Sequence, residues 1–197
     1  MPERKPRADA LRNREAVLAA ADRLFAACDR PEDVTMADIA AAAGVGKGTL
    51  FRGFGDRTGL IRALYEARLE PVRRAITDGP RPLGPDTPPA ERVPALLDAV
   101  LCFKLDHRHL SLALEGTGSD SPYRAEHYDW WHATLRDVVE QLPGFPDGDF
   151  TAHALLAAVR ADLVDHLAGR RQMSRERLRA DLAAFTARVL GGGDPTP

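Results

Sequence analysis

The segment 35–54, TMADIAAAAGVGKGTLFRGF, holds residue types that suit contact with DNA. One cationic side chain, Lys47, stands among three small residues, Gly46, Gly48 and Thr49. A lysine ammonium can donate to guanine O6 or N7 or neutralise a phosphate, and a threonine can contact a thymine methyl group. Small neighbours let the backbone approach a ligand closely. This chemistry predicts recognition of a nucleic-acid groove rather than catalysis.

Two short helices joined by a tight glycine turn must position these side chains. Thr35 followed by Asp38 has the spacing of a capping box, with an aspartate where a glutamate is commoner. Gly44 stands where the chain has to turn, and Val45 is expected to fill the angle between the helices. The second helix begins near Lys47. This pattern predicts a helix-turn-helix, whose second helix enters the DNA major groove.

The apolar side chains of the second short helix have a structural role in this interpretation. Leu50, Phe51 and Phe54 are predicted core residues that hold the helix in place. The polar and small residues between them are then left to face the groove.

The charge distribution supports a DNA-facing N-terminal end. The net charge is −2, but 14 Lys and Arg stand against 11 Asp and Glu through Ile76, and 13 stand against 18 thereafter. A basic end attached to an acidic body suits nucleic-acid binding. For the basic cluster at the extreme N-terminus, a solvated tail is the alternative interpretation.

The whole chain is predicted to be all-α, with about nine helices. Its 197 residues, 44% of them hydrophobic and 28% charged, are enough for a buried core. Apolar residues recur at helical spacing, and the segments 77–92 and 143–149 are rich in proline or glycine and predict loops. Pro71 is expected to bend or interrupt the helix 57–76. Two final helices are predicted at about 150–168 and 174–190.

Several classes of protein are excluded by composition and motifs. The sequence has no run of eighteen apolar residues, so no membrane span is expected. No apolar stretch follows the charged N-terminus, so no secretory signal is expected. The two cysteines, Cys28 and Cys102, lack CxxC spacing, so a reduced, cytoplasmic protein is expected. GVGKGT departs from the P-loop pattern, and no recognised motif supplies a nucleophile. We therefore expect no enzyme, no cofactor and no metal site.

The N-terminal third resembles the DNA-binding end of the TetR (tetracycline-repressor) family of bacterial transcriptional regulators. The resemblance lies in AVLAAADRLFA and in VTMADIAAAAGVGKGTLFRGFGDRTGLIRALYEARL. It implies a three-helix DNA-binding domain at 1–55 and a helical ligand-binding and dimerisation domain at 56–197, with 56–76 as the connecting helix. It also implies a one-component regulator, which we expect to be a repressor. Such a protein binds a palindromic operator as a homodimer and is released by a small-molecule effector. A metal- or redox-responsive regulator with the same DNA-binding domain is the alternative.

The resemblance also implies which residues contact DNA. Thr35 is expected to meet a phosphate at its helix start, and Arg52 and Arg57 are expected to contact the backbone. Phe51 stands where the family usually has tyrosine, and Gly53 where it commonly has histidine or tyrosine, so two phosphate contacts are missing. Basic residues at the N-terminus are expected to compensate by following the backbone or entering the minor groove. The predicted DNA-binding residues are Arg4, Lys5, Arg7, Thr35, Gly46, Lys47, Gly48, Thr49, Arg52 and Arg57.

Aromatic and polar residues of the C-terminal part predict a small-molecule pocket between helices. Trp131 falls on the apolar stripe of its helix and is expected in the core rather than in the pocket. Trp130 suits either a pocket wall or a dimer contact. Asp162 and His166 form an i, i+4 pair, but no metal-binding motif accompanies the histidines. The homodimer is expected to form through the helices 150–168 and 174–190. The candidate pocket residues are Phe103, His107, His109, Tyr123, His127, Trp130, Trp131, Thr134, Asp162 and His166.

Overall fold

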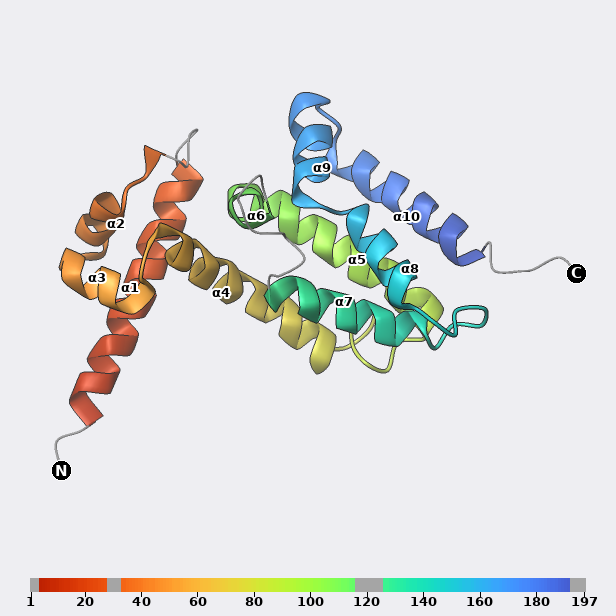
Figure 1. Ribbon diagram of the computed structural model, residues 1–197, viewed down its shortest axis with the longest axis horizontal. Helices are drawn as coiled ribbons and strands as arrows, with labels where there is room; N and C mark the ends of the chain where they lie inside the picture. Colours follow the sequence, from red (N-terminus) through yellow and green to blue (C-terminus); the bar gives the residue numbers. More distant parts are fainter. Residues whose placement is uncertain (1–3, 28–32, 116–125, 192–197) are drawn as a thin grey trace, which may run out of the picture. The chain divides into compact units, whose positions relative to one another are not determined.

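The computed structural model describes residues 4–27, 33–115 and 126–191, and these residues form helices joined by turns and loops (Figure 1). No strand occurs among them, which confirms the predicted all-α class. The elements in chain order are α1 (Arg4–Ala27), α2 (Met36–Ala43), α3 (Lys47–Phe54), α4 (Arg57–Thr77), α5 (Pro89–Asp106), α6 (Arg108–Glu115), α7 (Glu126–Val139), α8 (Asp149–Ala157), α9 (Ala161–Asp165), the π-helical turn η3 (His166–Arg170) and α10 (Arg175–Gly191).

The structure divides into two compact units, and the division lies inside α4. The first unit comprises residues 1–67 and the second residues 68–197. Helix α4 runs without a break past Pro71, so this proline does not interrupt the helix. The domain boundary predicted at 55/56 lies at the beginning of the same helix. None of the helices in the described ranges is long and apolar enough to cross a membrane.

The first unit is built on the apolar faces of α1 to α4. Its fully buried side chains include Ala21 of α1, Ile39 of α2, Leu50 of α3 and Leu60 of α4. Small residues on α1 and α2 let these helices pack closely, and α1 and α2 contact one another extensively. The N-terminal half of α1, by contrast, is exposed from residue 9 to residue 16.

Helix α5 is the centre of the second unit. It contacts α6, α7, α9 and α10, and its side chains Val93, Leu97 and Val100 are buried. It begins with Pro89 at a position that needs no backbone N–H donor, so the loop predicted at 77–92 ends four residues earlier than expected. From α7, Trp131 and Leu135 complete the core against α5.

The single helix predicted at 150–168 is interrupted. Helix α8 ends at Ala157, and α9 begins at Ala161 after Arg160, whose ψ of 144° is extended rather than helical. The cause is a side chain from another helix. Buried Glu115 at the end of α6 accepts a hydrogen bond of 3.0 Å from the backbone N–H of Ala161, and so caps α9.

Candidate functional site

A capping box begins α2, as the sequence predicts. The Asp38 backbone N–H donates to Thr35 Oγ1 at 3.2 Å, and the Thr35 backbone N–H donates to Asp38 Oδ2 at 3.0 Å. The Thr35 hydroxyl donates to the same carboxylate oxygen at 2.6 Å. These hydrogen bonds from Thr35 hold the pKa of the Asp38 carboxyl below its ordinary value. The single hydroxyl hydrogen of Thr35 already donates to Asp38. The side chain can therefore donate to a DNA phosphate only if the hydrogen bond to Asp38 breaks.

The turn between α2 and α3 requires glycine. Gly44 has φ +66°, in the left-handed region, and its N–H lies against the carbonyls of Ala40 and Ala41 at the end of α2. The Val45 N–H then donates to the Ala40 carbonyl at 3.0 Å, which closes the turn. Any residue with a Cβ would be strained at this φ. The turn therefore sets the angle at which α3 leaves α2.

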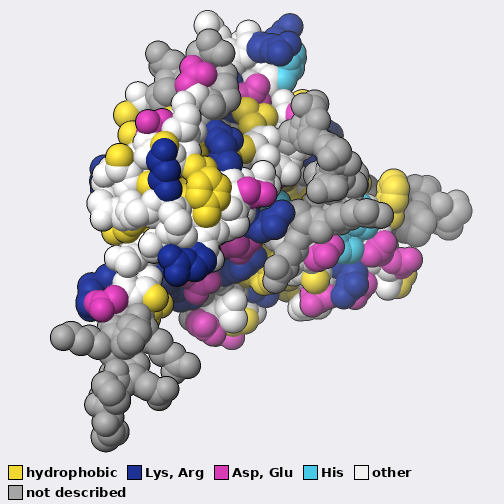
Figure 2. Space-filling model, turned by 60° about the vertical axis from the view of Figure 1, so that its left-hand side comes forward, with side chains coloured by type: hydrophobic (Ala, Val, Ile, Leu, Met, Phe, Trp, Pro, Cys, Tyr) yellow, Lys and Arg dark blue, Asp and Glu magenta, His cyan; other side chains and the backbone are white. Residues whose placement is uncertain are grey.

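The predicted groove-facing residues lie exposed on α3. Lys47, Gly48, Thr49 and Arg52 are all solvent-accessible. Among the described residues, no side chain caps the beginning of α3, where Gly46 is the N-cap. Its first backbone N–H groups and the helix dipole there favour an anion. Figure 2 brings this end of the chain forward and shows Lys and Arg side chains interspersed with exposed hydrophobic ones.

The prediction that Phe51 is a core residue is wrong. Its side chain is 48% exposed, whereas Leu50 next to it is 1% exposed. The physical reason is helical phase: Phe51 lies one turn after Lys47, on the outward face, and Leu50 occupies the inward one. Phe54 is half-buried, and the guanidinium of Arg14 stacks on its ring at 4.8 Å.

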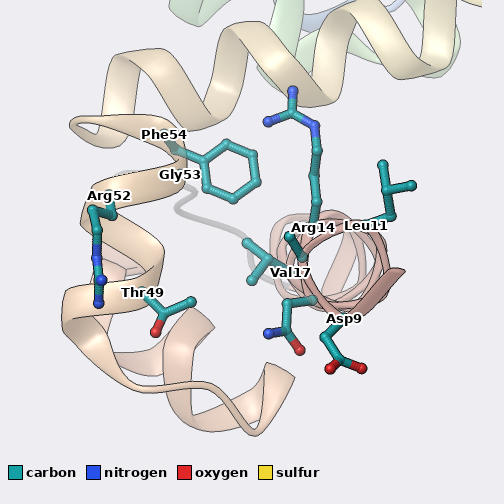
Figure 3. Close-up of a pocket in the computed structure, with 10 residues that line it drawn as sticks. Asp9, Leu11, Arg14, Val17, Thr49, Arg52, Gly53 and Phe54 are labelled. Carbon is teal, nitrogen blue, oxygen red and sulfur yellow. The ribbon is translucent and has the colours of Figure 1, made fainter. Parts of the chain in front are cut away.

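A hollow of about 710 Å³ separates α3 from the first half of α1 (Figure 3). Val17 and Phe54 form its apolar floor, and Thr49 stands at its edge. Arg52 and Arg14 lie on the two helices that bound it. The side chains predicted to contact DNA are thus carried by a helix that α1 supports along only part of its length.

The remaining predicted contacts fall into two groups. Arg57 is half-buried: its guanidinium lies 5.5 Å from the ring of Phe25 and donates to the Val34 carbonyl at 3.4 Å. It therefore links the beginnings of α4 and α2 to α1. Arg4, Lys5 and Arg7 belong to the first turns of α1, and their side chains lie outside the described part of the chain. The predicted arm is thus helical.

The structure brings only part of the predicted ligand pocket together. His127 and Trp131 line a cavity of about 20 Å³, room for about one water molecule. Phe103 packs against His107, with ring centroids 4.9 Å apart. Tyr123 lies outside the described residues. The cavity is otherwise lined by Val100, Lys104, Glu115, Tyr128, Leu156 and Arg160.

The other predicted pocket residues serve different contacts. The Arg73 guanidinium covers the ring of Trp130 at 5.0 Å, and the Thr134 hydroxyl donates to the Trp130 carbonyl at 2.8 Å. Asp162 accepts two hydrogen bonds of 3.0 Å from Arg160, which keep the pKa of its carboxyl below the ordinary value. His109 is half-buried, and His166 is exposed.

An ion pair at this cavity was missed by reasoning from the sequence. Lys104 donates to Glu115 at 2.7 Å, and both side chains are only 9% exposed. Burial lowers the pKa of the Lys104 ammonium, against the attraction of Glu115. Nothing local in the sequence distinguishes these two residues from solvent-exposed ones, because they stand on different helices.

The structure and site define an all-helical protein with a helix-turn-helix DNA-binding unit, and known proteins agree. Residues 17–64 match the sequence model described as bacterial regulatory proteins, tetR family. A candidate TetR-family transcriptional regulator from Rhodococcus sp. has the same fold, with a TM-score of 0.67 and 21% identity over 90% of this chain and 98% of that one. No curated protein matches the chain.

Two further solved structures share the fold. A TetR-like transcriptional regulator from Rhodococcus sp. RHA1 has a TM-score of 0.61 and 22% identity, over 91% of this chain and 96% of that one. NalD, the secondary repressor of the MexAB-OprM multidrug efflux pump in Pseudomonas aeruginosa, has a TM-score of 0.54 and 19% identity, over 92% and 97%. At sequence identities of 19–22%, the similarity to these three solved structures shows a shared fold only. The match of residues 17–64 shows that the N-terminal end of the chain carries a DNA-binding domain of the TetR type.

Proposed function

We propose that the chain is a repressor that binds a palindromic operator through α3 of two copies. The observation that supports this most is the exposed leading end of α3, where Lys47 and Thr49 stand beside glycines that leave the backbone open. We assign groove contact to Gly46, Lys47, Gly48 and Thr49. Arg52 and the N-terminal basic residues of α1 contact phosphates, and the helical state of Arg4, Lys5 and Arg7 favours the backbone over the minor groove.

A homodimer forms through α8 and α10 in this proposal. Phe150 at the beginning of α8 is 81% exposed, the most exposed large hydrophobic side chain in the described part of the chain. On α10, Ala180, Ala183, Ala184 and Ala187 are exposed as well. Such faces are covered when a copy of the same helix pair packs against them.

Release follows from binding of a small molecule in the second unit. Helix α4 contributes residues to both units, so a change of its tilt would alter the spacing of the two recognition helices. By linkage, the effector must bind the DNA-incompetent form more tightly. Because it binds DNA inside a bacterial cell, the protein acts in the cytoplasm.

Operator binding by Lys47 variants tests the proposal. Lys47→Ala is expected to weaken binding to the upstream region of its own gene by about 1–3 kcal/mol if Lys47 contacts a guanine, with little change on random DNA. Arg62→Ala, an exposed arginine on α4, serves as the matched control. The measurement is a gel-shift titration at fixed salt. Equal affinity of wild-type protein for upstream and random DNA would contradict the proposal.

A further inference from the structure

Two histidines and an aspartate meet where α7 and α8 lie side by side in the second unit (Figure 1). His132 comes from α7, and Asp149 and His153 come from α8. One ligand atom from each of the three residues lies within 4.8 Å of the other two. No residue of this cluster belongs to the predicted DNA-binding set or pocket.

The spacing of the residues along the two helices produces this arrangement. Asp149 and His153 stand at i, i+4 on α8, and therefore on one face of it. His132 Nε2 lies 3.4 Å from Asp149 Oδ1, and His153 Nε2 lies 3.9 Å from Asp149 Oδ2. Ligand atoms bound to one tetrahedral Zn²⁺ at about 2.0–2.2 Å lie roughly 3.3–3.6 Å apart. The two histidine–aspartate separations are close to this, and the two histidine nitrogens, which lie within 4.8 Å of one another, must draw closer.

A tyrosine supports one of the histidines from behind. The Tyr128 hydroxyl lies 2.6 Å from His153 Nδ1. When His153 Nδ1–H donates to this oxygen, the lone pair of the imidazole is on Nε2, the atom that faces Asp149. An outer partner of this kind fixes the tautomer and the ring orientation of a metal-binding histidine.

The three rings are stacked against one another, so one imidazole has to turn before both nitrogen lone pairs can point at the same ion. The imidazoles of His132 and His153 are stacked with centroids 3.9 Å apart and planes 22° apart, and Tyr128 lies nearly parallel to both. His132 is 13% exposed, whereas His153 and Asp149 are 42% and 57% exposed. An ion can therefore reach the cluster from solvent, and the two exposed side chains can turn to complete the geometry.

We propose that His132, Asp149 and His153 bind a divalent transition-metal ion of the Zn²⁺ type, with Tyr128 as the positioning residue. Two imidazole nitrogens and one carboxylate suit Zn²⁺, Ni²⁺ or Cu²⁺ and exclude Mg²⁺ and Ca²⁺ as preferred ions. Three protein ligands leave a fourth position for water or a small ligand. The ion would tie the first residue of α8 to α7. This inference does not depend on the proposed operator binding.

Metal titration of the full-length protein tests the site. After chelator treatment, the wild-type chain is expected to bind one Zn²⁺ at this site, measured by calorimetry against a competing chelator. His153→Ala and Asp149→Asn are expected to reduce the affinity more than about 100-fold, and Tyr128→Phe about 10–100-fold. His166→Ala, an exposed histidine outside the cluster, serves as the matched control and is expected to bind as the wild type does. Circular dichroism verifies that each variant is folded.

A second measurement separates the proposed site from adventitious binding. Co²⁺ bound by the wild type is expected to show the visible absorption of a four-coordinate site, and this band should vanish in His132→Ala. If the wild type binds Zn²⁺ no more tightly than His153→Ala, or if Tyr128→Phe and His166→Ala weaken binding equally, the proposal is overturned.

Discussion

At the scale of the residue, Phe51 gives the recognition helix an unusual outward surface. Its ring is exposed on the same face as Lys47, yet it has no group that can donate to a phosphate. The side chain is 48% exposed, so a hydroxyl added at the outer edge of the ring can remain in solvent in the free protein. Any gain in affinity from a polar atom on the ring of residue 51 would therefore come from a contact with DNA.

Phe51→Tyr is expected to tighten operator binding by about tenfold, because a phenol can donate a hydrogen bond to a charged phosphate. The midpoint of thermal unfolding should not change, since the added hydroxyl remains in solvent in the free protein. A gel-shift titration and a thermal melt measure the two effects. Unchanged affinity would show that the ring of residue 51 does not reach the DNA backbone.

At the scale of the element, α3 contains two glycines that its own fold does not require. A Cβ added at Gly48 or Gly53 would meet no atom within 4 Å in the described part of the chain. Glycine within a helix costs about 1 kcal/mol relative to alanine. The two glycines therefore lower the stability of the free protein. Any gain that offsets this loss must arise when the protein binds a partner.

Gly48→Ala is expected to raise the free energy of unfolding by about 1 kcal/mol and to weaken operator binding, because its methyl group would stand between α3 and the DNA. Gly53→Ala is the matched control, with the same gain in stability and a smaller effect on binding. Urea denaturation and gel-shift titration provide the two readouts. If both variants bound the operator equally well, the proposal that Gly48 allows α3 to approach DNA closely would be wrong.

The end of α6 and the beginning of α9 depend on one buried ion pair. Lys104→Met is expected to destabilise the protein by about 3–5 kcal/mol, because it leaves the carboxylate of Glu115 buried without a partner charge. Lys104→Met combined with Glu115→Gln should recover most of this loss, since the amide oxygen can still accept from Ala161. Chemical denaturation of both single variants and the double variant measures the coupling. Additive losses would mean that the pair contributes nothing as a pair.

At the scale of the whole molecule, the proposed operator recognition depends on the oligomeric state. A single α3 contacts one half-site, and two copies at a fixed spacing are needed for a palindrome. The exposed hydrophobic side chains of the described chain lie in both units, which allows a direct comparison. Phe150 lies in the proposed dimer face, whereas Leu11 lies on α1 of the DNA-binding unit.

Phe150→Asp is expected to dissociate the proposed dimer, because it places a charge in an apolar contact. Leu11→Asp, a change of the same kind at a side chain that is 61% exposed, should leave the dimer intact. Sedimentation velocity at several concentrations measures both. A monomeric wild type, or a dimer that survives Phe150→Asp, would contradict the assignment of this face.

The sequence predicts features that are encoded locally and misses those that depend on distant segments. Thr35, Asp38 and Gly44 act within a few residues of themselves, so the capping box and the turn could be recognised. The break at Arg160 could not, because its cause, Glu115, is a residue of another helix. The histidine cluster was missed for the same reason, although the i, i+4 spacing of Asp149 and His153 was visible.

The hydrogen bond from Ala161 to Glu115 also has a consequence for exchange with solvent. An amide at the beginning of a helix normally exchanges through local fraying, without unfolding of the protein. Here the acceptor is a buried side chain that comes from 46 positions earlier in the chain and is paired with Lys104. The hydrogen bond of the Ala161 amide can break only when α9 separates from α6. We expect deuterium to reach this amide as slowly as it reaches the centre of α5, although Ala161 is the first residue of a five-residue helix.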